Sequence, residues 1–226
     1  MEITKENVEK LLRVEIHDLS LYQNAFVHKS ASKNFGKSNE RLEFVGDSVL
    51  GLVVARYLYE KYPDENEGFL TRVRTKIVGG KNLAKFANTL GLQNYVVMND
   101  KAMQNEWNKN PRILEDTFEA LIGAMYLDIG LASARDFILE TLKLNMNENE
   151  MIEDTNYKDM LMKHLQSNCN MLPEYKMIDQ DGPDHKKYFT MQITLDKKTL
   201  GEGKGKSKKD AEQNAAMRVL KCLNKI

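Results

Sequence analysis

Hydrophobic residues in the first part of the chain recur every three or four positions, which is the spacing of helices with one buried face. The pattern predicts a helix and turn within residues 4–20, a long helix from about 40 to 62, helices within 68–91 and another over 112–128. Polar stretches at 63–67 and 99–111 predict a turn and a loop. This part of the chain is therefore expected to be all-helical.

From residue 157 onward the pattern changes to helix, short strands and helix. Residues 157–167 predict a helix, 174–179, 187–195 and 198–203 predict three strands, and 207–223 predict a closing helix with Ser207 as its N-cap. The Asn- and Glu-rich segment before this part is typical of a linker. We predict an all-α domain over 1–144, a linker over 145–154 and a small α+β domain, of order αβββα, over 155–226.

Charge is divided unequally between these parts, although the 226-residue chain has a formal net charge of zero. Residues 1–154 contain 19 Lys and Arg against 24 Asp and Glu, whereas residues 155–226 contain 14 against nine. An acidic body with a basic second domain indicates metal chemistry in the first and polyanion binding in the second. The alternative is a charge-balanced two-domain protein that has no polyanion partner.

Other features of the composition limit the class of protein. The charged start MEITKENVEK and the lack of an apolar run of about 18 residues predict a protein of the cytoplasm or another intracellular compartment, with no secretion signal and no membrane partner. The two cysteines, Cys169 and Cys222, are too few for a disulfide framework, so both are expected to be reduced.

The helix predicted from residue 40 carries three carboxylates on one side. At about 100° per residue, Glu40, Glu43 and Asp47 lie within roughly 60° of one another. The opposite side is hydrophobic, with Leu42, Val45, Val49, Leu52 and Val53. The acids have no Lys or Arg at the helical spacing that forms ion pairs. One side of this helix is therefore acidic and the other is predicted to be core.

The helix predicted over residues 112–128 has the same construction. Asp116 and Glu119 are separated by three residues, and the small residues Ala120 and Gly123 leave room beside them. If the two acidic sides face each other, at least four carboxylates converge, and such a cluster is costly unless a hard divalent cation lies within it. Oxygen ligands alone favour Mg²⁺ or Mn²⁺ over Zn²⁺. Spacing alone leaves a second interpretation open, namely two ordinary amphipathic helices with solvated acids.

These residues carry a resemblance to a known family. The segments NERLEFVGDSVL (39–50) and ILEDTFEALIGAMYLDIG (113–130) resemble the two acidic motifs of the ribonuclease III family of double-stranded-RNA endonucleases. The segments AFVHKS (25–30) and EGFLTRVRTKIV (67–78) resemble two further motifs, with Lys29 in place of an arginine. The matches occur in family order over most of residues 1–143. We therefore expect a nuclease.

The resemblance assigns roles to particular acids. It implies that Glu43, Asp47, Asp116 and Glu119 are catalytic, hold Mg²⁺ (for which Mn²⁺ can substitute) and hold the attacking water. By the same resemblance, Glu40 and Glu67 are supporting acids. Hydrolysis of duplex RNA to 5′-phosphate and 3′-hydroxyl ends and a homodimer are also implied. Phe44, Gly51 and Val54 border the acidic side of the helix, where we expect the helix of a second copy to pack. The alternative is an inactive RNA-binding accessory or structural subunit.

The chain departs from the family at Glu115, where small residues are common; from its helical angle we expect this side chain to point away from the cluster and to perturb it little. It also departs at Gly79-Gly80-Lys81, where many members have Ser-Glu. His28 is interpreted as a hydrogen-bonded structural residue rather than a general base.

The lysine-rich segment GEGKGKSKK (201–209) resembles a nucleotide-binding loop only superficially, because that motif requires glycine at position 200, which is Leu200. We predict instead that Lys206, Lys208 and Lys209 bind a phosphate at the start of the closing helix, where free N–H groups favour an anion.

The αβββα order, with LPEY, GPDHKKYF and GEGKGKSKKDAEQNAA, resembles the double-stranded-RNA-binding domain. That resemblance implies a minor-groove contact from the loop that holds His185 and another from the first helix. Met162 occupies a position on that helix where many members have glutamine.

Overall fold

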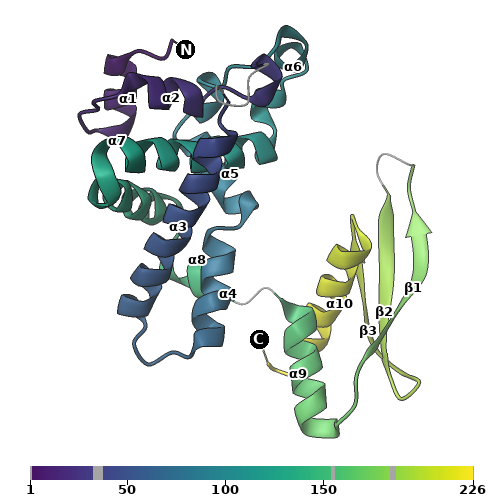
Figure 1. Cartoon of the computed structure of the whole chain (residues 1–226). Coiled ribbons are helices and arrows are strands. Elements are labelled where there is room, and N and C mark those ends of the chain that lie inside the picture. The colour runs from purple at the N-terminus through teal and green to yellow at the C-terminus, as the bar shows by residue number, and fades with distance from the viewer. Residues whose placement is uncertain (1, 33–37, 154–155, 184–186, 226) are drawn as a thin grey trace. The chain divides into compact units, whose positions relative to one another are not determined.

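The computed structural model describes residues 2–32, 38–153, 156–183 and 187–225. It divides into two compact units, Met1–Ile152 and Glu153–Ile226. The first unit is helical, and the second combines a three-stranded sheet with two helices (Figure 1).

The helical unit contains helices of very different length. In chain order they are α1 (Lys5–Leu12), α2 (Leu19–Ala25), α3 (Glu40–Lys61), α4 (Glu67–Ile77), α5 (Gly80–Thr89), α6 (Asp100–Gln104), α7 (Pro111–Asn145) and α8 (Glu148–Ile152), with short 3₁₀ turns at Lys29–Ala31, Leu92–Asn94 and Trp107–Lys109. The sequence predicts the long helix over 40–62 correctly. It predicts only a loop over 99–111, where the structure has α6 and a 3₁₀ turn because Ala102 packs with Val96, Met98 and Ile113.

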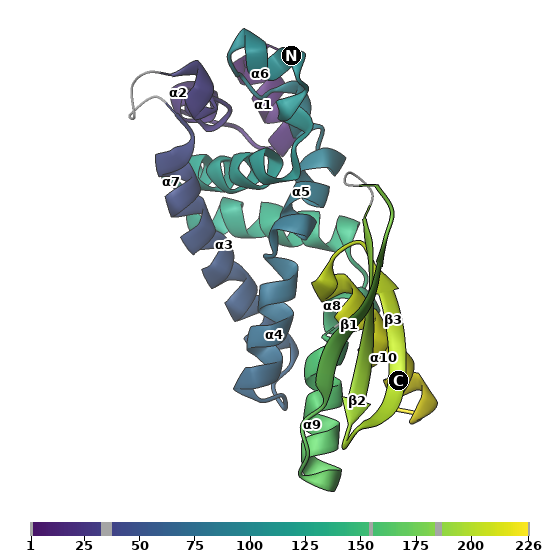
Figure 2. The ribbon, with the colours of Figure 1, turned by 90° about the vertical axis from the view of Figure 1, so that its right-hand side faces the viewer.

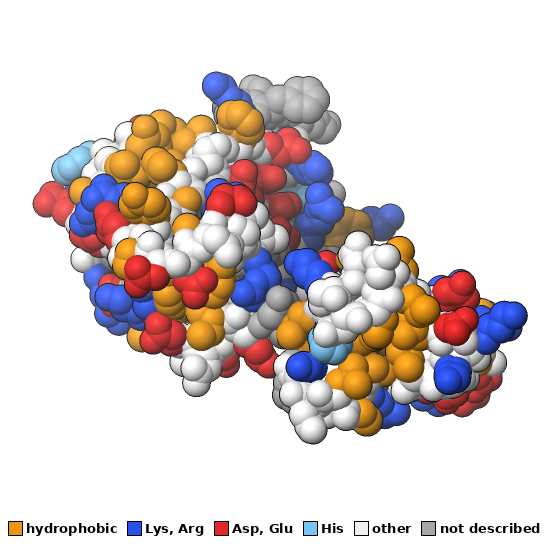
Figure 3. Space-filling model, turned by 90° about the horizontal axis from the view of Figure 1, so that it is seen from below, with side chains coloured by type: hydrophobic (Ala, Val, Ile, Leu, Met, Phe, Trp, Pro, Cys, Tyr) orange, Lys and Arg blue, Asp and Glu red, His pale blue; other side chains and the backbone are white. Residues whose placement is uncertain are grey.

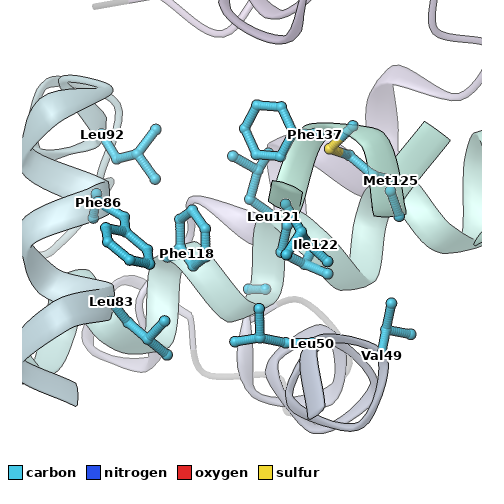
Figure 4. Close-up of a cluster of buried hydrophobic side chains, with 14 of the residues drawn as sticks. Val49, Leu50, Leu83, Phe86, Leu92, Phe118, Leu121, Ile122, Met125 and Phe137 are labelled. Carbon is cyan, nitrogen blue, oxygen red and sulfur yellow. The ribbon is translucent and has the colours of Figure 1, made fainter. Parts of the chain in front are cut away.

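The core of this unit surrounds α7, which packs against α2, α3 and α5. Figure 4 shows side chains from α3, α5 and α7 meeting in this core. Phe118 of α7 lies between two other aromatic rings, with its centroid 5.9 Å from that of Phe86 and 6.5 Å from that of Phe137. Such ring pairs stabilise beyond the area they bury. The helix that carries two of the predicted catalytic acids is therefore held firmly.

Helix α7 extends 17 residues beyond the predicted end at residue 128, with a bend at Gly130. Gly130 has a φ of +83°, a conformation that glycine adopts without strain. Among the described residues, α7 is the one helix whose length and composition would suit a membrane span. However, half of its most hydrophobic stretch is buried inside the protein. A buried core helix passes the same test.

Residues 145–152 belong to the helical unit, which differs from the predicted linker over 145–154. Met146 and Met151 are buried in the core of this unit. The backbone carbonyls of Asn145 and Ile152 accept hydrogen bonds from Lys85 and Arg72. The few hydrophobic residues of this polar segment are thus enough to fix it, because the surface of the helical unit offers them a place to pack.

The second unit has the element order predicted from the sequence: α9 (Tyr157–Cys169), β1 (Glu174–Asp181), β2 (Tyr188–Leu195), β3 (Lys198–Gly205) and α10 (Lys208–Cys222). The strands form an antiparallel sheet of order β1-β2-β3. Both helices cover one face of the sheet (Figure 2), where Leu161, Ile193 and Val219 form part of a small core.

Two glycines on β3 bring the sheet close to α10. A Cβ on Gly203 would lie 2.1 Å from the backbone nitrogen of Ala215, and one on Gly205 would lie 2.4 Å from that of Ala211. Side chains at these positions would push α10 off the sheet. The glycines of the lysine-rich segment thus serve packing between strand and helix.

The surface of the helical unit carries mixed charges. Figure 3 shows one face, on which acidic, basic and hydrophobic side chains are interspersed.

Candidate active site and RNA-binding surface

The backbones of α3 and α7 touch where the acidic residues lie. A Cβ on Gly46 of α3 would lie 1.7 Å from the carbonyl oxygen of Glu119, and a Cβ on Gly123 of α7 would lie 2.1 Å from that of Leu42. Glycine at both positions permits this contact. Gly123 is recognisable in the sequence as a small residue beside the acids, whereas the role of Gly46 was not predicted. Its signal is a glycine inside a long helix, next to the acid Asp47.

This contact brings the four predicted catalytic acids together. Glu43 and Asp47 come from α3, and Asp116 and Glu119 come from α7. Glu119 is the most buried of them, with 9 % of its surface exposed. Glu43 and Asp116 are half-buried, and Asp47 is exposed. The four acids therefore range from a buried carboxyl at Glu119 to an exposed one at Asp47.

The surroundings of the buried Glu119 carboxyl disfavour its negatively charged form. Burial raises the pKa of Glu119 to about 8, and the charges of Asp47, Glu115, Glu43 and Asp116 contribute to the rise. Among the described residues, no ion pair or hydrogen bond to the Glu119 side chain offsets these effects. A cation close to this carboxyl would relieve the repulsion.

The pKa values of two other acids in the cluster, Glu43 and Asp116, are also raised. Burial raises the pKa of Glu43, as do the charges of Asp116 and Glu40. Burial also raises the pKa of Asp116, although the positive charges of Arg112 and Lys29 oppose the rise. The effect of the Asp116 charge on Glu43 shows that an acid of α7 lies close to an acid of α3. The acidic sides of the two helices therefore face each other in the structure, as the sequence predicts.

The chemistry of these residues suits a hard divalent cation. All four are carboxylates, so every donor is an oxygen, as Mg²⁺ and Mn²⁺ prefer. In the described part of the chain, however, no three Asp, Glu, His or Cys side chains are grouped closely enough to hold a metal ion. Ligation by three of the acids would require side chains to turn toward a common point.

The two supporting acids predicted from the sequence differ in position. Glu40 lies beside the cluster; its carboxylate pairs with Lys29 at 3.2 Å and accepts a hydrogen bond from the buried Ser38. Glu67 lies in the first turn of α4, where it is exposed and accepts a hydrogen bond from Thr71. Among the described interactions, none joins Glu67 to the four acids. The structure thus brings Glu40 to the site but not Glu67.

The expectation that Glu115 perturbs the cluster little is wrong. Its charge raises the pKa of Glu119, with an effect second only to that of Asp47 among the neighbouring acids. The reason is helical geometry, because residues 115 and 119 are one turn apart on the same side of α7.

His28 has the structural role expected of it. Its ring nitrogen Nδ1 accepts a hydrogen bond from the backbone N–H of Ser30 at 3.1 Å, at the start of a 3₁₀ turn. Burial and the charge of Lys29 lower the pKa of His28. The neutral ring that the hydrogen bond requires is therefore favoured.

The predicted phosphate-binding lysines lie together at the start of α10. Ser207 caps this helix by accepting a hydrogen bond from the N–H of Asp210, and Asp210 accepts one in return from the N–H of Lys206. Lys206, Lys208 and Lys209 are all exposed. Met162 is exposed on α9. His185 lies outside the described residues.

Comparison with known proteins identifies both units. The family model described as Ribonuclease-III-like matches residues 18–146. The chain belongs to the ribonuclease III family. The double-stranded RNA binding motif matches residues 157–223. The resemblance found in the sequence and the predicted fold class are both confirmed, and the chain is an enzyme, a ribonuclease III-like endonuclease with a motif for binding duplex RNA.

Individual relatives support the assignment over nearly the whole chain. A putative protein of Paramecium bursaria Chlorella virus 1 is 45% identical over 220 residues, covering 97% of this chain and 79% of that protein. The ribonuclease 3 of Sulfurovum sp. is 38% identical over 221 residues, covering 96% of this chain and 97% of the relative. The solved nuclease domain of ribonuclease III from Campylobacter jejuni superposes with a TM-score of 0.60 at 38% identity, covering 63% of this chain and 99% of that domain.

Proposed function

We propose that this endonuclease cleaves double-stranded RNA by divalent-metal-assisted hydrolysis, leaving 5′-phosphate and 3′-hydroxyl ends. The observation that carries the proposal is the buried carboxyl of Glu119 surrounded by Asp47, Glu43 and Asp116. A phosphodiester is a stable anion, and its hydrolysis requires both charge neutralisation and an activated water. Four carboxylates at the contact of two rigid helices are suited to hold the cation that supplies both.

Each acid has a distinct part in the proposed site. Glu43, Asp47, Asp116 and Glu119 would hold Mg²⁺ or Mn²⁺. When bound, the cation would stabilise negative charge on the phosphate and lower the pKa of a bound water. The burial of Glu119 keeps bulk water from its carboxyl, and the exposure of Asp47 leaves that acid accessible to substrate. Glu40, fixed by Lys29 and Ser38, orients groups beside the cluster.

The second unit would bind the duplex. The exposed Lys206, Lys208 and Lys209 surround the N-terminus of α10, so a backbone phosphate there would meet both side-chain charge and free N–H groups. Domains of this type recognise the shape of A-form RNA and its 2′-hydroxyls, with little dependence on sequence. Preference for duplex RNA would thus come from this unit, and cleavage from the helical one.

We also propose a homodimer. The Campylobacter jejuni nuclease domain is described as having a region involved in dimer formation. On α3 of this chain, Phe44, Leu52 and Tyr59 are 77 %, 57 % and 73 % exposed and lie within roughly 80° on one side of the helix. A second copy that covers this side would remove three large hydrophobic side chains from water. Two sites related by a twofold axis would then each cut one strand.

The surface on α3 differs from the one expected. The sequence suggested Phe44, Gly51 and Val54 as the border of the dimer contact, and Leu52 as core. In the structure Val54 is fully buried in the core of its own unit, whereas Leu52 faces outward. Leu52 also lines a cavity of about 520 Å³ between α3 and α4, together with Tyr59 and Leu70.

The experiment that tests the proposed chemistry is Glu119→Gln, which keeps size and removes charge. Cleavage of a duplex RNA in saturating Mg²⁺ should fall by orders of magnitude, because weakened metal ligation forfeits several kcal/mol of barrier reduction at about 1.4 kcal/mol per tenfold in rate. Affinity for the duplex, measured by gel shift, should change little, since the binding lysines lie in the other unit.

Two results would contradict the proposal. If Glu119→Gln cleaves as fast as the unchanged protein, Glu119 is not part of the catalytic centre. If the unchanged protein binds duplex RNA but does not cut it with Mg²⁺ or Mn²⁺, the protein is an accessory RNA-binding subunit. The ends of the product, mapped by their susceptibility to a 5′-phosphate-dependent exonuclease, test the predicted direction of hydrolysis.

A further inference from the structure

The carboxyl group of Glu115 on α7 lies directly against Gly80 at the start of α5. A Cβ on Gly80 would be 2.2 Å from Oε2 of Glu115 and 2.5 Å from its Cδ. Any other residue at position 80 would therefore displace this carboxylate. Because the obstructing atoms belong to the end of a flexible side chain, a small residue at position 80 would move the carboxylate without moving the helices.

Glu115 held in this place extends the acidic cluster. It precedes Glu119 by one helical turn, so the two side chains are neighbours on α7. Asp116 lies on the other side of Glu119 around the helix. Glu119 is more than nine-tenths buried and has no described ion pair or hydrogen bond from its side chain. A fifth carboxylate therefore stands next to the most buried acid of the site.

A purely structural role for Glu115 is the competing explanation. Helix α5 begins at Gly80, and its N-cap, Gly79, offers no side chain to accept a hydrogen bond. A carboxylate near this positive end of α5 would stabilise the helix. Such a role would change the stability of the protein without changing its affinity for a cation.

We propose that Glu115 is a positioning residue of the candidate active site, and that Gly80 holds its carboxylate where it strengthens the binding of a divalent cation by the four acids. This inference rests on the proposed function, because it concerns the cation of that site. It assigns a role to two positions, 80 and 115, that the four-acid site does not include.

The test is a titration of the full-length protein with Mn²⁺ in the absence of RNA, followed by the electron paramagnetic resonance of free Mn²⁺. Glu115→Gln should weaken binding on the order of three- to tenfold, because one charge near the cation is lost in a partly solvated site. Gly80→Ala should also weaken binding, since the carboxylate is displaced although its charge is kept.

The double variant provides the decisive comparison. If Gly80 acts only through Glu115, Gly80→Ala together with Glu115→Gln should bind Mn²⁺ no more weakly than Glu115→Gln alone. Glu65→Gln, which removes an exposed carboxylate from the turn before α4, is the matched control and should leave the affinity unchanged.

Three outcomes of the Mn²⁺ titration would contradict the role proposed for Glu115 and Gly80. Unchanged Mn²⁺ affinity in Glu115→Gln, with or without a lower melting temperature, overturns the inference and assigns Glu115 to the support of α5. An additive double variant overturns the link between Gly80 and Glu115. In either case the proposed function stands if the unchanged protein binds Mn²⁺ and cuts duplex RNA. If the unchanged protein binds no Mn²⁺, both the inference and the proposed metal chemistry fail.

Discussion

The carboxyl of Glu119 links stability to pH in a predictable direction. Its pKa in the folded protein is raised to about 8 from an ordinary value of 4.5, so between these values the folded state binds more protons than the unfolded state. The free energy of unfolding should therefore fall as pH rises through this range. Glu119→Gln removes the titrating group. In EDTA, the variant should melt at a higher temperature than the unchanged protein above pH 8, and at nearly the same temperature near pH 4.

Glu65→Gln is the control for this measurement, because its carboxylate is exposed. Its melting temperature should differ from that of the unchanged protein by the same small amount at both pH values. If the difference in melting temperature between Glu119→Gln and the unchanged protein does not depend on pH, the charge of Glu119 does not destabilise the folded protein.

At the scale of elements, the contact between α3 and α7 depends on glycine. Gly46→Ala would place a Cβ within 1.7 Å of the backbone of Glu119, a clash that only a shift of a helix can relieve. Overpacking of this kind costs about 1–3 kcal/mol and would separate the acids of the two helices. Urea denaturation should show the loss of stability, and RNA cleavage should fall with it.

The same helix provides the matched control. Gly51 has no atom within 4 Å of a Cβ built on it, so Gly51→Ala meets no obstruction within the unit. Alanine in a helix is favoured over glycine by about 0.5–1 kcal/mol, and the variant should be as stable as the unchanged protein or slightly more so. Equal stability of the Gly46 and Gly51 variants would contradict the packing described here.

Asp128 of α7 makes a second contact between elements of the helical unit. Its carboxylate accepts hydrogen bonds from the backbone N–H groups of His17 and Asp18 and from the hydroxyl of Tyr22, which fixes α2 to α7. Burial raises the pKa of Asp128, but these bonds together outweigh it and hold the pKa below its ordinary value. Their contribution is thus present at neutral pH and lost as pH falls through that lowered pKa. Asp128→Asn should lower the melting temperature at pH 7 and have a smaller effect near pH 3.

At the scale of the whole molecule, we expect the second unit to bind duplex RNA and the helical unit to cleave it. Removal of residues 155–226 should weaken affinity for a 30-base-pair RNA duplex most strongly at physiological salt, because the acidic helical unit repels a polyanion. Filter binding at several salt concentrations measures this. Equal affinity of the truncated and full-length proteins would contradict the assignment of RNA binding to the second unit.

The dimer is tested on the full-length protein by light scattering. We expect about twice the 26.0 kDa of one chain, and Phe44→Ser together with Leu52→Ser should shift the protein toward monomer, since both side chains are exposed within one copy. A mass near 26.0 kDa for the unchanged protein, with cleavage of both strands intact, would reject the dimer.

The sequence by itself determined the order of the main elements and which of its helices carry the acidic residues. Spacing predicted the long helices and the αβββα order, because helix and strand periods are properties of neighbouring residues. The same spacing placed Asp116 and Glu119 on one side of α7. Local pattern also predicted Ser207 as an N-cap, since a cap is made within four residues of chain.

Only the tertiary structure decided which residues meet across the chain. Gly46 and Gly123 lie far apart in sequence, so their joint role at the contact of α3 and α7 appears only once the helices are packed. The same holds for Glu115 against Gly80, and for the opposite placements of Val54 and Leu52 on α3. Periodicity tells which side of a helix a residue occupies, but what covers that side depends on long-range packing.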